Sequence, residues 1–168
     1  MNKFILIVIL VLISFVAKAQ EIPYEKLDSI SESVSKLQLK ADNLVYNDGK
    51  EDYLLSFPKN NFQILYSTGK AQRAVYKKKG DKELFFLSEN IDLTKADEIS
   101  QYLNTGSVGV VRMSFPEGVS TQIYTNGVYT NTITEYYLEF FYDKNRSHYF
   151  QDQDLVYGNL LVFFKYGI

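Results

Sequence analysis

Few side chains in this sequence could act in catalysis. The 168-residue chain has one histidine, His148, and no cysteine, so thiol nucleophiles, disulfides and iron-sulfur ligands are excluded. A Ser-His-Asp site would need a nucleophile beside His148 in space, and the adjacent Ser147 would point to the opposite face of an extended strand. We therefore interpret His148 as a loop residue without a catalytic role. Nucleotide-binding, zinc-protease and esterase motifs are also absent from the sequence, which disfavours an enzyme and predicts no cofactor.

One carboxylate has an unusual setting. Glu139 lies between Leu138 and Phe140 in an otherwise apolar segment, and apolar surroundings favour the neutral form of a carboxyl group. Paired with Asp143 or Asp152, it would suit a small hydrolase that uses two carboxylates. The interpretation that we favour is simpler. On a strand Glu139 alternates outward while its two neighbours face the core.

A polar loop near the C-terminus partly follows the spacing of an EF-hand calcium site. Its candidate ligands are Asp143, Asn145, Ser147 and Asp154. His148 stands where the sharp turn of such a loop requires glycine, and the preceding segment reads as a strand rather than a helix. We therefore expect a polar loop and no metal site.

The clearest local signal is Asn126-Gly127 with β-forming residues on both sides. Both residue types tolerate the positive φ of a two-residue type I′ turn, so the sequence predicts a β-hairpin. In the simplest register Thr125 faces Val128, Tyr124 faces Tyr129 and Ile123 faces Thr130. The tyrosine pair, together with amide side chains, would form a surface suited to a protein or a sugar ring. The candidate partner-binding residues are Gln122, Tyr124, Tyr129 and Asn131.

Other strands are expected on both sides of this hairpin. Strands are predicted at 62–67, 71–78 and 83–88, with turns at 68–70 and 79–81, and Leu84–Leu87 should be buried on both faces in mid-sheet. Further strands are expected at 108–115, with a turn at 116–118, and at 136–142. The 71–88 hairpin is rich in cations, which either grip phosphate or lipopolysaccharide or, as we favour, protect an edge strand. These cations are Lys70, Arg73, Lys77, Lys78, Lys79 and Lys82.

Helices are expected to cover the sheet. Apolar residues recur every three or four positions from Tyr24 to Tyr46, which predicts a long amphipathic helix. We expect it to dock on the sheet, so that a monomer is favoured over a coiled-coil dimer. A shorter helix is predicted at 95–104, where Thr94 and Asp97 resemble a capping box. The segment 152–166 fits a helix or a strand, and we expect a helix.

Composition and the N-terminus predict export. Residues 1–19 have a basic start, an apolar run and the small-residue pattern Ala17-Lys18-Ala19, which resembles a bacterial Sec signal peptide. Cleavage would leave a single domain at 20–168 without a retained membrane span, in the periplasm, at the cell surface or secreted. The formal net charge of −2 predicts no attraction to nucleic acid. An outer-membrane barrel is disfavoured because the expected strands are too short.

Together these patterns predict an α+β fold, with a curved antiparallel sheet of about six or seven strands packed by the long N-terminal helix and by shorter helices. The expected function is that of an exported, non-catalytic domain that binds a protein or glycan through the hairpin surface. The alternative is the carboxylate-dependent hydrolase.

Overall fold

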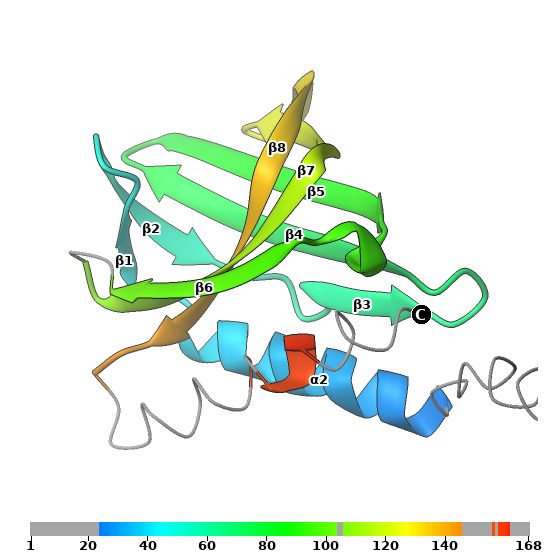
Figure 1. Cartoon of the computed structure of the whole chain (residues 1–168). Coiled ribbons are helices and arrows are strands. Elements are labelled where there is room, and N and C mark those ends of the chain that lie inside the picture. Colours follow the sequence, from blue (N-terminus) through cyan, green and yellow to red (C-terminus); the bar gives the residue numbers. More distant parts are fainter. Residues whose placement is uncertain (1–23, 104–105, 146–155, 157, 162–168) are drawn as a thin grey trace, which may run out of the picture.

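The computed structural model describes residues 24–103, 106–145, 156 and 158–161. In this part of the chain eight strands form one strongly curved antiparallel sheet, a half-barrel with few helices (Figure 1). The predicted curved antiparallel sheet is confirmed. The elements are α2 (Tyr24–Lys40), β1 (Val45–Asn47), β2 (Asp52–Ser56), β3 (Phe62–Leu65), β4 (Lys70–Lys79), β5 (Lys82–Ile91), the 3₁₀ helix η1 (Leu93–Lys95), β6 (Glu98–Leu103), β7 (Val108–Thr125) and β8 (Val128–Asp143).

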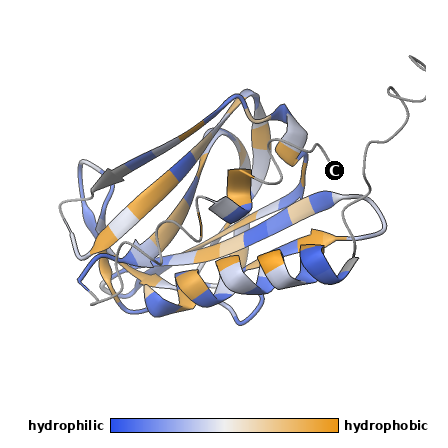
Figure 2. Ribbon diagram, turned by 60° about the horizontal axis from the view of Figure 1, so that its bottom comes forward, coloured by the Kyte–Doolittle hydropathy of each residue, from blue (hydrophilic) through white to orange (hydrophobic). Residues whose placement is uncertain are grey.

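Helix α2 is amphipathic as predicted but shorter. Hydrophobic and hydrophilic residues alternate along it (Figure 2). The apolar side chains that face the sheet are buried, among them Leu27 and Leu37. The prediction that the helix continues to Tyr46 is wrong, because it ends at Lys40. Asn43 adopts a φ of 61° and donates its backbone N–H to the Leu55 carbonyl at 2.8 Å, so the chain turns away to become β1.

Two serines of α2 close the free side of β3. Ser35 Oγ accepts the backbone N–H of Phe62 at 3.2 Å and donates to the Phe62 carbonyl at 2.7 Å. Ser31 Oγ accepts the N–H of Ile64 at 3.1 Å. Serines four positions apart lie one above the other on a helix, so they supply the hydrogen bonds that a neighbouring strand would otherwise provide.

Strand β4 lies inside the sheet. It pairs with β3 and β2 along one side and with β5 along the other. The prediction that its cations protect an edge is therefore wrong. The cations of this hairpin have different environments. Lys70 pairs with Asp92, Lys79 pairs with Glu51 at 2.7 Å, and Arg73 is buried. Strand β5 is in mid-sheet as predicted, although the side chains of Leu84–Leu87 are half-buried.

The helix predicted at 95–104 is also wrong. Only Leu93–Lys95 is helical, capped by Asp92, and the chain then forms β6. In β6, Ile99 pairs with Met113 of β7 and packs against the core. A helix of about ten residues is marginal in isolation, so pairing with a long strand decides the conformation.

The β7–β8 ribbon is the longest element of the sheet. Strand β7 pairs with β8 along its length, while its other side pairs with β6 at 109–114 and with β5 at 121–125. The turn predicted at 116–118 is wrong, because these residues form an irregularity within β7, with Gly118 at a φ of 74°. This break in the register lies where β7 changes partner from β6 to β5, and bulges of this kind bend a strand.

Buried apolar side chains form two clusters on opposite sides of this ribbon. The helix-side cluster joins α2 to Phe62, Val111, Met113, Leu138 and Phe140. The inner cluster lies within the curve of the sheet and contains Tyr46, Leu55, Val75, Val110 and Phe141.

Three predicted features lie wholly or mostly outside the described residues. They are the signal peptide at 1–19, His148, and the segment 152–166, of which residues 156 and 158–161 are described and helical. None of the described helices is long and apolar enough to cross a membrane.

Candidate functional site

The tip of the β7–β8 hairpin has the predicted turn. Asn126 and Gly127 have φ values of 48° and 79°, as a type I′ turn requires. Thr125 faces Val128 and Tyr124 faces Tyr129, as expected. Asn126 also exchanges hydrogen bonds with Glu83 of β5, donating its backbone N–H at 2.9 Å and accepting through Oδ1 at 2.8 Å. The turn is therefore fixed to the neighbouring strand.

Beyond the tyrosine pair, the register differs from the expected one. Ile123 faces Asn131 rather than Thr130, because β8 carries one extra residue between the two pairs. Asn131 therefore lies on the face of Ile123, opposite to the tyrosines. Thr132 takes the expected place of Asn131, and its hydroxyl lies 3.0 Å from that of Tyr129. The predicted group of four residues is thus divided between two faces.

The tyrosines belong to a row of aromatic rings that crosses four strands. Tyr76 of β4 stacks on Phe85 of β5 with centroids 4.4 Å apart. The ring centre of Phe85 lies 5.7 Å from that of Tyr124, and Tyr124 and Tyr129 form a T-shaped pair with centroids 5.7 Å apart. The Tyr124 hydroxyl donates to Gln122 Oε1 at 2.7 Å. We call this surface the hairpin face, and it consists of Tyr76, Phe85, Gln122, Tyr124, Tyr129 and Thr132.

No residue of the hairpin face carries a charge. The nearest charges along β4 and β5 on this side are Lys78 and Glu83, which face each other at the end of the row. The row follows the cross-strand pairs Tyr76 with Phe85, Phe85 with Tyr124 and Tyr124 with Tyr129. Sequence analysis found only the last pair. Phe85 and Tyr124 come from segments far apart in the chain, whereas Tyr76 and Phe85 lie in the predicted 71–88 hairpin, for which no pairing register was predicted.

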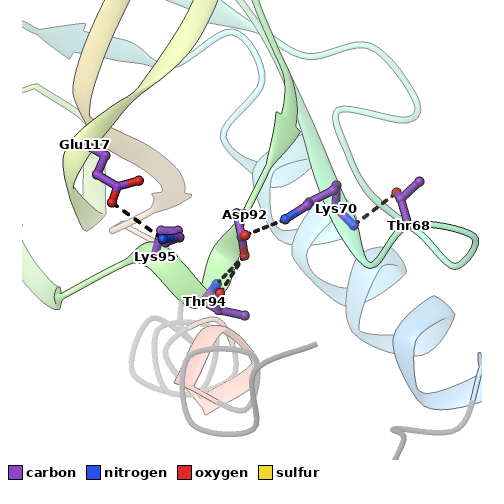
Figure 3. A network of polar contacts seen from close by, with 6 residues as sticks. All are labelled: Thr68, Lys70, Asp92, Thr94, Lys95 and Glu117. Atoms are coloured by element: carbon purple, nitrogen blue, oxygen red, sulfur yellow. Dashed lines mark hydrogen bonds and ion pairs between the residues drawn. The ribbon is translucent and has the colours of Figure 1, made fainter.

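A cleft of about 420 Å³ adjoins this face at the bend of β7. Gln122 belongs to both, and the cleft has an apolar floor that includes Phe115 and Val119. Its rim is held by polar contacts that Figure 3 shows. Lys95 pairs with Glu117 at 3.5 Å, and Asp92 pairs with Lys70.

Asp92 organises the side of the cleft next to η1. Its Oδ1 accepts the Thr94 hydroxyl at 2.7 Å and the Thr94 backbone N–H at 3.2 Å (Figure 3). The hydrogen bond from Lys70 and those from Thr94 lower the pKa of Asp92 below its ordinary value, although burial opposes this. The carboxylate is therefore anchored in its charged form at neutral pH.

The predicted outward position of Glu139 is wrong. The carboxylate points into the curve of the sheet with 12% of its side chain exposed, and Arg112 Nη2 lies 2.7 Å from Oε1. The Tyr46 hydroxyl donates to Oε2 at 2.7 Å. Arg73, which is buried, donates its Nε–H to the Glu139 carbonyl at 2.9 Å. This polar group, together with Lys77, is called the interior polar cluster below.

Lys77 lies beside this group and against aromatic rings. Its Nζ lies 4.7 Å from the ring centre of Tyr46 and 5.1 Å from that of Phe86. Burial lowers the pKa of Lys77, while the charge of Glu139 acts in the opposite direction. Contact with the two aromatic rings and with the nearby carboxylate opposes the effect of burial, because both favour the ammonium form.

The structure describes only part of the predicted carboxylate pairs and of the predicted calcium loop. Asp143 is four residues from Glu139 on β8, a separation of about 13 Å along a strand, which is beyond the roughly 10 Å of a glycosidase pair. Asp152, Ser147 and Asp154 lie outside the described residues.

Of the predicted calcium loop, Asp143 and Asn145 are described. Asp143 Oδ1 accepts the backbone N–H of Asn145 at 2.9 Å. The described residues contain no cluster of three or more metal-ligating side chains.

No protein-family model, curated protein or solved structure matches this chain.

Proposed function

We propose that this protein is an exported, non-catalytic domain that binds a protein partner through the hairpin face. The observation that carries the proposal is the uncharged aromatic row across β4, β5, β7 and β8. Export rests on the signal-peptide pattern of residues 1–19.

The chemistry of the row is that of a protein-binding surface. Interface cores are enriched in tyrosine and phenylalanine and depleted in charge. Tyr124 and Tyr129 combine apolar rings with hydroxyl groups, and such residues often carry a large share of binding energy. The cross-strand packing of the rings holds them in place, so little side-chain entropy is lost on binding.

The ring geometry favours a protein over a glycan. A sugar stacks on an open ring face, whereas one face of Tyr76 and one face of Phe85 are stacked on each other with an angle of 26° between the rings. Tyr129 presents its ring to Tyr124 at 75° and is 55% exposed. The row therefore offers ring edges, hydroxyls and amides, which match the mixed surface of a protein.

The test compares binding by the purified exported protein and its variants. Tyr124→Ser and Tyr129→Ser together should abolish capture of a partner from the extract of the source cells, with a small change in the melting temperature. Tyr66→Ser is the matched control, since Tyr66 is 63% exposed and lies at the β3–β4 turn. Retention of the same partners by the double variant would contradict the proposal. Binding on a glycan array that depends on both tyrosines would assign the face to sugars instead.

The alternative of a carboxylate-dependent hydrolase has less support. Both oxygens of Glu139 are engaged, one by Arg112 and the other by Tyr46. A general acid or base must be able to exchange a proton with a substrate, and this arrangement instead resembles a structural ion pair. Turnover of glycans or esters that is lost in Glu139→Gln would restore this alternative.

A further inference from the structure

The outer strands of the sheet differ in whether their free backbone groups form hydrogen bonds with other segments. The free side of β3 is closed by Ser31 and Ser35 of α2. At β1, the carbonyl of Val45 accepts the backbone N–H of Ser107 at 2.9 Å. Strand β8 pairs with β7 alone, and in the described part of the chain no backbone hydrogen bond joins the outer edge of residues 128–135 to another segment.

This open edge also lacks the usual chemical protection against pairing. Native edge strands are commonly blunted by lysine, proline or an inward-pointing charge. The segment 128–134 reads VYTNTIT and has no lysine, proline or charged residue, and the one inward-pointing charge of this edge is Glu135 at its end. It is rich in β-branched side chains, which favour strand pairing. Val128 and Tyr129 are 70% and 55% exposed.

We infer that two copies of this protein pair through the β8 edges, antiparallel and about a two-fold axis at residues 130–134. Such pairing places the segment 128–134 against itself, so that no charge meets a like charge. The first charge along the strand is Glu135, which is turned away to accept the Thr121 hydroxyl at 2.7 Å. Self-matching of an uncharged edge is the argument for a second copy over an unrelated strand.

The register of the pair follows from the bulge in β8. The extra residue of β8 lies between Tyr129 and Asn131, so regular extended geometry begins at Asn131. An axis at Thr132 would place each Thr132 opposite its own equivalent and Asn131 opposite Ile133. The two hairpin faces would then continue into one another across the joined sheets. The inference does not depend on the proposed partner, because it concerns backbone groups at the edge.

Engineered cysteines test the geometry directly, since the chain has no cysteine of its own. Three single variants of the exported protein, Thr130→Cys, Thr132→Cys and Thr134→Cys, sample the same edge. Under mild oxidation, the one at the axis should form a disulfide dimer at least tenfold faster than the matched control. The control is Ser120→Cys, which is exposed on β7 and lies away from the edge. Equal rates for all four variants would overturn the inference.

Mass in solution provides the second readout. Sedimentation of the wild-type protein over a range of micromolar concentrations should show a monomer–dimer equilibrium. Thr132→Lys places two like charges at the axis and should raise the dissociation constant at least tenfold, whereas Ser120→Lys should leave it unchanged. Melting temperatures verify that both variants are folded. A wild-type protein that remains monomeric at every concentration, or equal effects of the two lysines, would overturn the inference.

Discussion

Glu139 is the acidic residue of the interior polar cluster, and its loss should be costly. In Glu139→Gln the half-buried Arg112 loses its charged partner, and the Tyr46 hydroxyl loses a charged acceptor. Removing one partner of such a pair costs about 1–3 kcal/mol or more, because the remaining group stays desolvated. We expect the free energy of unfolding in urea to fall by roughly that amount.

The matched control for this substitution is Glu32→Gln. Glu32 pairs with Lys36 at 2.7 Å on α2, with 63% and 67% of the two side chains exposed. Exposed helix pairs contribute only about 0.3–0.5 kcal/mol. An equal effect of the two substitutions would mean that the interior pair is as well solvated as the surface pair.

Asp92 should make the protein sensitive to acid. Its pKa is lowered in the folded protein by Lys70 and Thr94, so the unfolded chain takes up the proton first as the pH falls. The stabilisation is therefore fully present above the ordinary carboxyl pKa of about 4 and is lost below it. Urea unfolding between neutral and acidic pH should show a shallower loss of stability for Lys70→Met than for the wild type. Lys82→Met, at the exposed β4–β5 turn, should retain the wild-type slope.

The candidate site shows how far single residues can be placed from sequence. The pair Tyr124 and Tyr129 followed from the turn chemistry of Asn126-Gly127, which is local. Asn131 was misplaced because a bulge of one residue moves a side chain to the other face, and nothing in the sequence marks it. Glu139 was misplaced because its partners, Tyr46 and Arg112, come from strands distant in the chain.

Helix α2 contributes hydrogen bonds as well as apolar surface to its contact with the sheet. Ser35→Ala removes the acceptor of the Phe62 backbone N–H, and Ser31→Ala removes that of Ile64. Each substitution should lower the free energy of unfolding by about 1–3 kcal/mol, because a buried or half-buried N–H is left without its partner. Thermal unfolding monitored by circular dichroism measures the effect.

Ser33→Ala is the control for the two serine substitutions. The Ser33 hydroxyl is exposed and donates to the Ser29 carbonyl of the same helix at 2.8 Å. Alanine has a higher helix propensity than serine, so this variant should be neutral or slightly more stable. If Ser31→Ala and Ser35→Ala behave in the same way, the contacts with β3 contribute nothing to stability.

Element boundaries followed from sequence where local chemistry decides them. The strands β3, β4 and β5 and their turns were predicted within a few residues, since glycine marks both turns. The helix at 95–104 failed because the local apolar spacing favours a helix, whereas the strand is selected by pairing with β7, which the local spacing does not show. Strand β7 was divided in two because Pro116 and Gly118 signal a turn, whereas here they form a bulge.

The curvature of the sheet could be predicted from the sequence, but not which distant strands pair with one another. The antiparallel order of β3, β4 and β5 follows from short connections, which place consecutive strands side by side. Strands β1, β2 and β6 were not predicted. The long-range pairings do not follow in this way. They include β2 with β4 and the change of β7 from β6 to β5. These pairings create the space that holds Glu139, so the interior polar cluster could not be found before the fold was known.

The dependence of the sheet on α2 gives the last prediction. A chain beginning at Gln20 should fold, because the first buried side chain among the described residues is Leu27, whereas a chain beginning at Ala41 should not. The four apolar residues Leu27, Ile30, Val34 and Leu37 are buried, and each contributes about 1.5–3 kcal/mol. Their sum is comparable to the roughly 5–15 kcal/mol that stabilises a whole domain.

Removal of α2 would also expose Phe62 and Phe140 and leave the N–H groups of β3 without their serine acceptors. We therefore expect the shorter chain to aggregate or to bind a hydrophobic dye without a cooperative melting transition. The chain from Gln20 should melt cooperatively. A shorter chain that melts cooperatively at the same temperature would show that the half-barrel is stable alone, and that the helix-side cluster is not needed to hold the β7–β8 ribbon in place.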